Sequence, residues 1–264
     1  MDIEANDIAV RYGRTAVLEG VRFTLRAGEM LGLIGPNGSG KTSLLRILAN
    51  LQAPDAGCVR YGGRSAANLG DRELAQRVAY LAQAGNVHWP MRVESLVALG
   101  RLPHRRPMQG LDSADRAAIE RAMVACDVIP FRTRTMSEVS GGERVRILLA
   151  RALAVEADIL LADEPIAALD PLHQLQVMEL LRVTARQGRG VVVVLHDLAL
   201  AARFCDRLVL LAHGNVLAEG QPAEVLCDEH VATAYGVEVI RGERDGVPFL
   251  LPWTPVSDDG RAKI

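Results

Sequence analysis

The stretch "GPNGSGKT", residues 35–42, decides the fold because it fits the pattern G-x-x-x-x-G-K-[ST]. A buried-strand pattern, "GEMLGLIG", leads into it, and an apolar-faced helix pattern, "KTSLLRILANL", begins within it. Glycines in such a turn let successive backbone N–H groups point inward around phosphate oxygens without side-chain clashes. The sequence therefore predicts a phosphate-binding loop between a central strand and a helix, and an ordinary glycine-rich turn is the weaker alternative.

The last two residues of this loop are expected to act on the phosphates and on a metal ion. Lys41 would place its charge at the β- and γ-phosphates, and the Thr42 hydroxyl would ligate Mg²⁺. Of 30 basic residues only Lys41 and Lys263 are lysines, so lysine stands at position 41 in a chain that otherwise uses arginine. The predicted nucleotide-binding residues here are Gly35, Pro36, Asn37, Gly38, Ser39, Gly40, Lys41, Thr42 and Ser43.

A second segment, "ILLADEP" at residues 159–165, places two carboxylates after four apolar residues. The apolar run predicts a central strand, and ligands of open α/β sheets bind at the carboxyl ends of the strands. We expect Asp163 to hold Mg²⁺ through water and Glu164 to polarise the attacking water as a general base. Solvated carboxylates at a strand end are the alternative interpretation.

Two further polar residues follow apolar strand patterns. Gln83 comes after "VAYLA", and His196 comes directly after "VVVVL". At the same edge of a parallel sheet, His196 could contact the γ-phosphate and hold the water in line. Gln83 could contact both the metal and the water, and a purely structural role remains open for each residue.

Hydrophobic periodicity divides the chain into a core and an insert. The first 30 residues alternate like antiparallel strands, residues 93–154 show helical spacing, and strands then alternate with helices. This order predicts an α/β fold with a parallel sheet, an N-terminal antiparallel β subdomain and an inserted α-helical subdomain. The expected boundaries are one domain at 1–240, with its core at 1–83 and 156–240 and its helical subdomain at about 84–155. Residues 241–264 are expected to form a loose tail.

Composition excludes several classes of protein. A formal net charge of -2 gives no electrostatic case for a nucleic-acid partner. The four cysteines form no C-x-x-C pair, which argues against a zinc site or redox motif and suggests a reducing compartment. No apolar run approaches the ~20 residues of a membrane-spanning helix, and the acidic start "MDIEAND" is unlike a signal peptide. We expect a protein that is soluble by itself, which leaves docking on a membrane protein open.

A second glycine loop opens the stretch "VSGGERVRILLARALA", residues 139–154, where another helix begins. Together with the other motifs, it resembles the ATPase subunits of ABC transporters, which have a P-loop NTPase (RecA-like) core. The resemblance spans residues 3–236 and is carried by "GPNGSGKT" as Walker A and "ILLADEP" as Walker B. It assigns Gln83 to the Q-loop, Asp170 to the D-loop, His196 to the switch, Tyr12 to adenine stacking, and "VSGGE" to the signature, usually LSGGQ.

The resemblance implies ATP hydrolysis with ATP and Mg²⁺ as cofactors, and a head-to-tail dimer of two copies. Ser140, Gly141 and Gly142 of one copy would then meet the γ-phosphate held by the Walker loop of the other. Only the closed pair would fully stabilise the charge of the transition state. Val139 departs from the common pattern by an apolar swap, whereas Glu143, Ile166 and Ala167 put contacts across that interface in question.

The type of ABC protein is indicated by the segments present in the chain and by a short motif at residues 100–104. One cassette, no long coiled coil, no membrane helices and a short tail together indicate a separate importer ATPase. The motif "GR-x-PH" at residues 100–104 resembles the corresponding segment of ATPases that import iron–siderophores, haem or cobalamin. A helix end stopped by Pro103, with a basic surface patch, is the alternative. We expect an iron(III) chelate as cargo, with haem or cobalamin as alternatives.

The expected partners are a second copy, a transmembrane permease and, indirectly, a periplasmic substrate-binding protein, which places the chain at the cytoplasmic face of the inner membrane. A cytoplasmic helix of the permease would lie against residues 84–102, with "NVHWPMRV" as the contact and Trp89 as either contact or core. A function of another class stays open: a soluble ABC protein whose ATP-dependent dimerisation is a switch.

Overall fold

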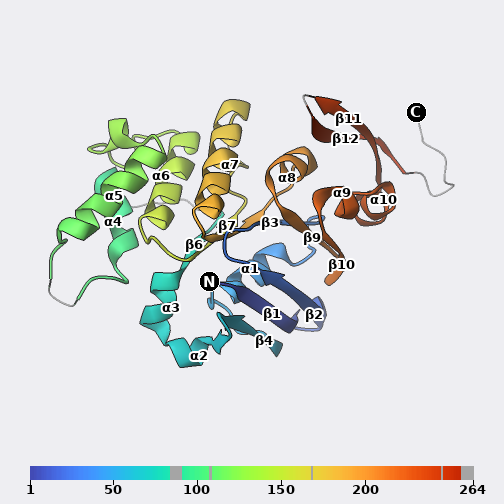
Figure 1. Cartoon of the computed structure of the whole chain (residues 1–264), viewed down its shortest axis with the longest axis horizontal. Coiled ribbons are helices and arrows are strands. Elements are labelled where there is room, and N and C mark those ends of the chain that lie inside the picture. Colours follow the sequence, from blue (N-terminus) through green and yellow to red (C-terminus); the bar gives the residue numbers. More distant parts are fainter. Residues whose placement is uncertain (84–90, 107–108, 168, 245, 257–264) are drawn as a thin grey trace.

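A computed structural model describes residues 1–83, 91–106, 109–167, 169–244 and 246–256 of the chain. A six-stranded sheet in the order β10-β9-β3-β8-β7-β6 forms the centre of the molecule (Figure 1). All neighbouring strands in it run parallel except β9 and β10. Its strands are β3 (Met30–Ile34), β6 (Val78–Leu81), β7 (Ile159–Asp163), β8 (Gly190–Val194), β9 (Arg207–Ala212) and β10 (Asn215–Gly220).

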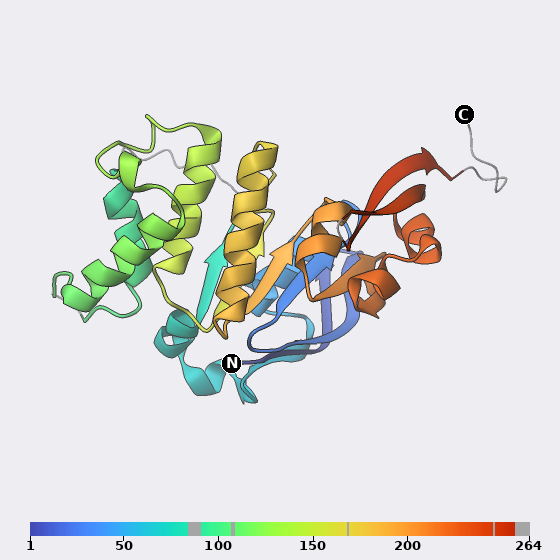
Figure 2. The same ribbon diagram turned by 45° about the horizontal axis from the view of Figure 1, so that its top comes forward.

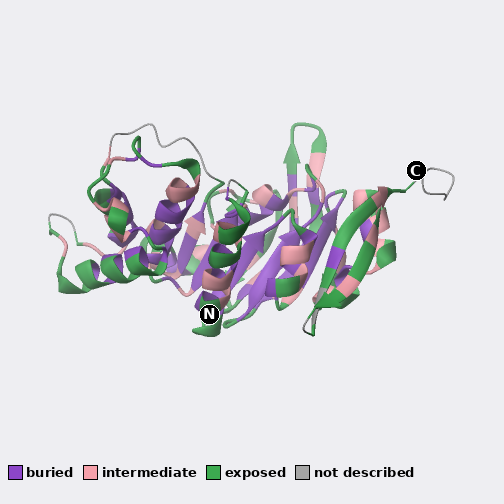
Figure 3. Cartoon of the chain, turned by 90° about the horizontal axis from the view of Figure 1, so that it is seen from above, coloured by how far each residue is buried: buried purple, intermediate pink, exposed green. Residues whose placement is uncertain are grey.

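The central strands consist mostly of apolar residues because both faces of the sheet are covered. Successive side chains of a strand point to opposite faces. In β7, Leu160 and Ala162 pack with the helices on one face, while Ile159 and Leu161 pack toward the N-terminal sheet on the other. Figure 3 shows these strands as the most continuously buried part of the chain. This double coverage explains why the sequence shows unbroken apolar runs rather than alternation.

The N-terminal part forms a separate antiparallel sheet in the order β2-β1-β4-β5. Its strands are β1 (Ile3–Tyr12), β2 (Thr15–Leu25), β4 (Ala56–Tyr61) and β5 (Arg64–Ser65). Helix α1 (Lys41–Leu48) buries Leu44, Leu45 and Leu48 in the same cluster as side chains of both sheets. The predicted fold class, an α/β core with an N-terminal antiparallel β subdomain and a helical insert, is confirmed.

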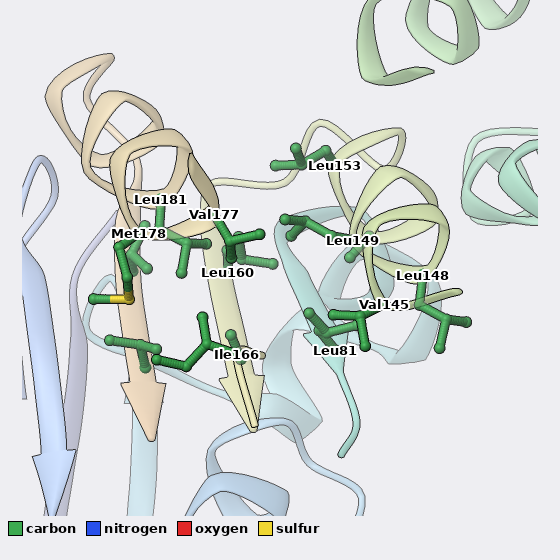
Figure 4. Close-up of a cluster of buried hydrophobic side chains, with 14 of the residues drawn as sticks. Leu81, Val145, Leu148, Leu149, Leu153, Leu160, Ile166, Val177, Met178 and Leu181 are labelled. Carbon is green, nitrogen blue, oxygen red and sulfur yellow. The ribbon is translucent and has the colours of Figure 1, made fainter. Parts of the chain in front are cut away.

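The insert contains α4 (Val93–Ala98), α5 (Ser113–Ala125) and α6 (Gly141–Leu153), with 3₁₀ turns at Leu99–Arg101 and Ile129–Phe131. Helices α7 (Pro171–Arg186) and α8 (Leu198–Phe204) cover the core sheet beside it (Figure 2). Leu149 and Leu153 of α6 face Val177 and Leu181 of α7 across a buried cluster (Figure 4). The insert is therefore packed onto the core through one hydrophobic cluster.

Four short helices were not predicted: α2 (Ala66–Leu69), α3 (Asp71–Arg77), α9 (Pro222–Val225) and α10 (Asp228–Tyr235). Each has four to eight residues, which is too short for hydrophobic periodicity to be distinctive. In the described part of the chain, no helix combines the length and the hydrophobicity that crossing a bilayer requires.

The expectation of a loose tail from residue 241 is wrong for its described part. Strands β11 (Val237–Arg244) and β12 (Val247–Pro255) pair as an antiparallel hairpin, which crosses the expected boundary at 240. The hairpin lies against α8, and Leu250 is buried in the main core. Three prolines in "VPFLLPWTP" obscured the strand, although proline is tolerated on the edge strands of which a hairpin consists.

Candidate nucleotide-binding site

The loop between β3 and α1 needs glycine at three positions. Gly35, Gly38 and Gly40 have φ angles of 148°, 80° and 97°. A Cβ on Gly35 would lie 2.2 Å from the Leu211 carbonyl oxygen, and one on Gly40 would lie 2.5 Å from Leu18 Cδ2. A Cβ on Gly38 would meet nothing within 4 Å, so that residue is required for its backbone angle alone. The loop is a backbone cradle whose shape only glycine permits.

Lys41 folds back into this loop. Its Nζ donates to the carbonyl oxygens of Gly35 and Pro36, each at 2.8 Å, and the residue is only 5% exposed. Burial lowers the pKa of Lys41, and the nearby negative charges of Glu164 and Asp163 partly offset that shift. An ammonium group has three N–H donors, so the third remains for an anion in the loop.

Asp163, at the end of β7, is the buried carboxylate of the site. Thr42 Oγ1 donates to its Oδ1 at 3.3 Å, and the Tyr80 hydroxyl donates to its Oδ2 at 3.3 Å. Burial raises the pKa of Asp163, with the Glu164 charge acting in the same direction, while the Thr42 hydrogen bond opposes the shift. Tyr80 was not predicted as a site residue, although it stands out as a single tyrosine within an otherwise apolar strand.

Glu164 lies between two residues that come from other strand ends. Gln83 Nε2 donates to Glu164 Oε2 at 2.7 Å, and His196 Nε2 lies 2.6 Å from Glu164 Oε1. The backbone of Glu164 is left-handed, with φ of 49°, a strained conformation that clusters at functional sites. A cavity of about 240 Å³ lined by Glu164 and His196 adjoins the group. Glu164 is thus in direct contact with both of the other predicted catalytic residues.

Tyr12 lies at the edge of this site and is 51% exposed. Its hydroxyl donates to Gln52 Oε1 at 2.9 Å and lies 3.2 Å from the Ser43 hydroxyl. These contacts hold the ring beside the first turn of α1, next to the phosphate loop. Gln52 was not predicted.

Asp170 and Ser140 both cap helices. Asp170 accepts from the His173 backbone N–H at 3.0 Å, and its second oxygen lies 2.8 Å from His173 Nδ1. Ser140 caps α6 in a reciprocal box with Glu143: the Ser140 N–H donates to Glu143 Oε2 at 2.7 Å, and the Glu143 N–H donates to Ser140 Oγ at 3.3 Å. The first of these bonds lowers the pKa of Glu143. Glutamate therefore fits this position as part of the helix cap.

The structure does not join the signature residues to the phosphate loop. Among the described residues, Ser140 hydrogen-bonds with Glu143 and Arg144, which belong to its own helix. Gly141 is exposed, and a Cβ on Gly142 would lie 3.4 Å from Leu169 Cδ2, near the D-loop. The two helix N-termini therefore belong to different parts of the chain, one to the core and one to the insert (Figure 1).

The structure explains one of the predicted departures near the site, Ile166, but does not describe most of the predicted permease contact. Ile166 is 6% exposed and packs in the main core, so its apolar side chain is explained by burial (Figure 4). The predicted permease contact "NVHWPMRV", with Trp89, lies largely outside the described residues, since 84–90 are not described.

A comparison with family models matches residues 18–167 to the ABC transporter model. The chain belongs to the ABC transporter family. This ABC ATPase binds and hydrolyses ATP, and its relatives place it in the importer class of ATP-binding subunits. It is 44% identical over 252 residues to a hemin import ATP-binding protein HmuV of Rhodococcus jostii, covering 95% of this chain and 86% of the relative.

One further relative and two solved structures are also similar to this chain. The ABC ATPase is 38% identical to a cobalamin import ATP-binding protein BtuD of Halobacterium salinarum, covering 98% of this chain and 64% of that one. A bacterial ABC transporter cassette solved as a dimer has a TM-score of 0.75 at 28% identity, covering 83% of this chain and 98% of that chain. A transporter described as metal-chelate type has a TM-score of 0.82 at 24% identity, covering 95% and 97%, and shows the shared fold.

Proposed function

We propose that two copies of this ABC ATPase pair head to tail around two Mg-ATP molecules and power import through a membrane permease. The observation that carries this proposal is the separation of two anion-suited helix N-termini within one chain. Ser140 and Gly141 are exposed and belong to the insert, whereas Lys41 is buried in the core loop. A second copy can bring the signature to the nucleotide that the first copy holds.

The phosphate loop would hold the triphosphate. Backbone N–H groups around Gly38 would surround it, and the third donor of Lys41 would bind the β- and γ-phosphates. The remaining predicted loop residues would line the same cradle, while the exposed ring of Tyr12 would stack on adenine.

The site residues also fit Mg²⁺. Within the described ranges, no group of three or more His, Cys, Asp or Glu could hold a metal by itself. Mg²⁺ prefers oxygen, and it binds through one or two protein groups together with waters and substrate phosphates. Thr42 Oγ1, Asp163 and the side-chain oxygen of Gln83 supply that kind of donor set, and the ion would neutralise charge on the phosphates.

Glu164 would act as the general base in hydrolysis. Each of its oxygens accepts one hydrogen bond, from Gln83 or His196, and a carboxylate has further lone pairs with which to accept from a water molecule. His196 would hold that water in line with the γ-phosphate. The hydrogen bonds from Gln83 and His196 fix the direction in which the carboxylate projects.

The partner copy would complete the site. The reciprocal cap of Ser140 and Glu143 leaves the first turn of α6 ordered, with Gly141 and Gly142 free of side chains that would block a phosphate. Their N–H groups and the Ser140 hydroxyl would bind the γ-phosphate, while Asp170 would lie at the same interface. Neither copy alone would fully stabilise the transition state, so hydrolysis is tied to closure of the pair.

Haem is the cargo that the relatives favour, ahead of the iron(III)-siderophore expected from the sequence and ahead of cobalamin. Several of the relatives at about 40% identity or above are named for hemin import. The cargo would pass through a permease whose cytoplasmic helix docks near the exposed Leu99 and Leu102, after delivery by a periplasmic binding protein. The chain would then act at the cytoplasmic face of the inner membrane.

An uptake assay tests this proposal. A strain lacking the gene is supplied with labelled haem, a labelled ferric siderophore or labelled cobalamin, and is complemented with the wild type or with Glu164→Gln. Haem uptake should be lost, and only the wild-type gene should restore it. Normal uptake of all three compounds would contradict a transport role and favour the soluble ABC switch.

A further inference from the structure

Residues 100–104, "GRLPH", contact the far end of the helix that carries the signature. Arg101 Nη1 donates to the carbonyl oxygens of Ala154 at 2.9 Å and Val155 at 3.4 Å. His104 Nε2 lies 2.8 Å from the Val155 carbonyl oxygen, and because a carbonyl only accepts, His104 presents Nε2–H. Carbonyl groups at a helix C-terminus have no partner within the helix. Arg101 therefore caps the end of α6 at Ala154, and His104 holds Val155, the residue that follows the cap.

Gly100 packs closely against α6, and Arg101 links the same point to α5. A Cβ on Gly100 would lie 2.3 Å from the Arg151 carbonyl oxygen, so only glycine allows the close approach to α6. The Arg101 side chain is 7% exposed and donates to Asp115 Oδ1 at 2.8 Å, near the start of α5. A buried cation beside the negative end of the α6 dipole is also electrostatically favourable.

The same segment is tied to the core sheet. Arg72 of α3 donates to the carbonyl oxygens of Pro103 at 3.1 Å, His104 at 3.2 Å and Arg105 at 2.8 Å. Gln76 Nε2 donates to the Pro103 carbonyl oxygen at 2.8 Å. Helix α3 leads directly into β6, and Gln83 follows the end of that strand. Residues 100–104 thus connect the signature helix with the strand that leads to Gln83.

We propose that Gly100, Arg101 and His104 form a clamp that sets the tilt of α6 and so positions Ser140 at the nucleotide of the partner copy. A helix of 13 residues is a stiff rod of about 20 Å, so a change at its C-terminus displaces its N-terminus. Misplacing a catalytic group by about 1 Å can lower a rate by about 100-fold. The clamp rests on the proposed function, because it acts through the contact of Ser140 across the dimer. These three are positioning residues.

The clamp is tested by measuring kcat and the Kd for ATP in two variants of the full-length protein. Arg101→Lys keeps the charge beside Asp115 but loses the fork of donors, and His104→Ala loses the bond to Val155. Both variants should lower kcat for ATP by about tenfold or more, while the Kd of the monomer for ATP should stay within about twofold. His104→Gln should restore most of kcat, because an amide N–H reaches the same carbonyl oxygen.

Arg207→Lys is the matched control. Arg207 also donates to a carboxylate, that of Glu29 at 2.7 Å, and to a backbone carbonyl, that of Thr24 at 3.1 Å. It lies in β9 of the central sheet, away from α6. It should lower the unfolding midpoint about as much as Arg101→Lys does, with kcat unchanged. An equal loss of kcat in Arg207→Lys, or wild-type kcat in Arg101→Lys and His104→Ala, would overturn the clamp.

Ser140→Arg in the same assay separates the two proposals. If Ser140→Arg abolishes turnover while the Arg101 and His104 variants keep it, the clamp fails and the proposed dimer stands. If Ser140→Arg hydrolyses ATP normally, the proposed function itself fails, and the clamp with it.

Discussion

His196 Nε2 lies 2.6 Å from Glu164 Oε1, which joins the polar end of β8 to the polar end of β7. Gln83, after β6, holds the other oxygen of the same carboxylate at 2.7 Å. Three neighbouring parallel strands therefore deliver the proposed base and both of its partners to one point. Single substitutions can therefore test the proposed base, nucleotide binding, the cap of α6 and the dimer contact independently.

Glu164→Gln should bind ATP, accumulate as a closed dimer and lose at least about 100-fold in kcat, because an amide of the same shape cannot take a proton from water. Hydrolysis in a single turnover and sedimentation with Mg-ATP measure the two effects. Turnover at the wild-type rate would contradict the assignment of Glu164 as base.

Lys41→Arg should reduce affinity for ATP by at least about tenfold although the charge is kept. The ammonium fits between two carbonyl oxygens at 2.8 Å in a buried position, and the larger planar guanidinium does not reproduce that geometry. Titration with a fluorescent nucleotide measures the Kd, and thermal unfolding checks that the variant is folded. Unchanged affinity would show that charge alone at this position is sufficient.

Glu143→Ala should lower the free energy of unfolding by about 0.5 to 1 kcal/mol at pH 7, because it removes one half of the α6 capping box. The folded pKa of Glu143 is lowered, so its stabilisation is present above the unfolded value of about 4.3 and is lost as pH falls through the folded pKa. Denaturant unfolding at pH 7 and at pH 3 measures the difference between wild type and variant, which should shrink at the lower pH.

Glu143→Gln is the control for that pH dependence. It keeps an acceptor for the Ser140 N–H but does not titrate, so its stability relative to Glu143→Ala should be the same at both pH values. A gap between wild type and Glu143→Ala that is equally large at pH 3 would contradict the role of the carboxylate.

Ser140→Arg should stop hydrolysis while ATP binding by the monomer stays intact, because Ser140 has no contact with the phosphate loop of its own chain among the described residues. Equilibrium binding at dilute protein concentration and steady-state turnover are the two measurements. Loss of binding by the monomer would mean that the signature serves its own nucleotide.

The proximity of the polar residues at the strand ends could be predicted from the sequence because strand ends are local features. Asp163, Gln83 and His196 each follow an apolar run, and parallel pairing brings such ends together whatever lies between them. The capping box of Ser140 and Glu143 also has a local signal in the sequence, the spacing S-x-x-E at residues 140–143.

Contacts between distant segments were not predictable in the same way. Arg101 hydrogen-bonds with the carbonyl oxygens of Ala154 and Val155, which lie more than 50 residues away in the sequence. Hydrophobic periodicity does not indicate which distant residues will pair in this way. The C-terminal hairpin did leave a local signal, the dipeptide Asp-Gly at residues 245–246, but the charged residues of β11 and the prolines of β12 obscured the two strands beside it.

The most direct test of the central claim is a structure of Glu164→Gln with Mg-ATP. We expect a head-to-tail dimer in which the Ser140 hydroxyl and the N–H groups of Gly141 and Gly142 lie within about 3.2 Å of γ-phosphate oxygens bound by the partner's Walker loop. A loaded structure in which residues 140–142 face solvent or their own chain's nucleotide would contradict it.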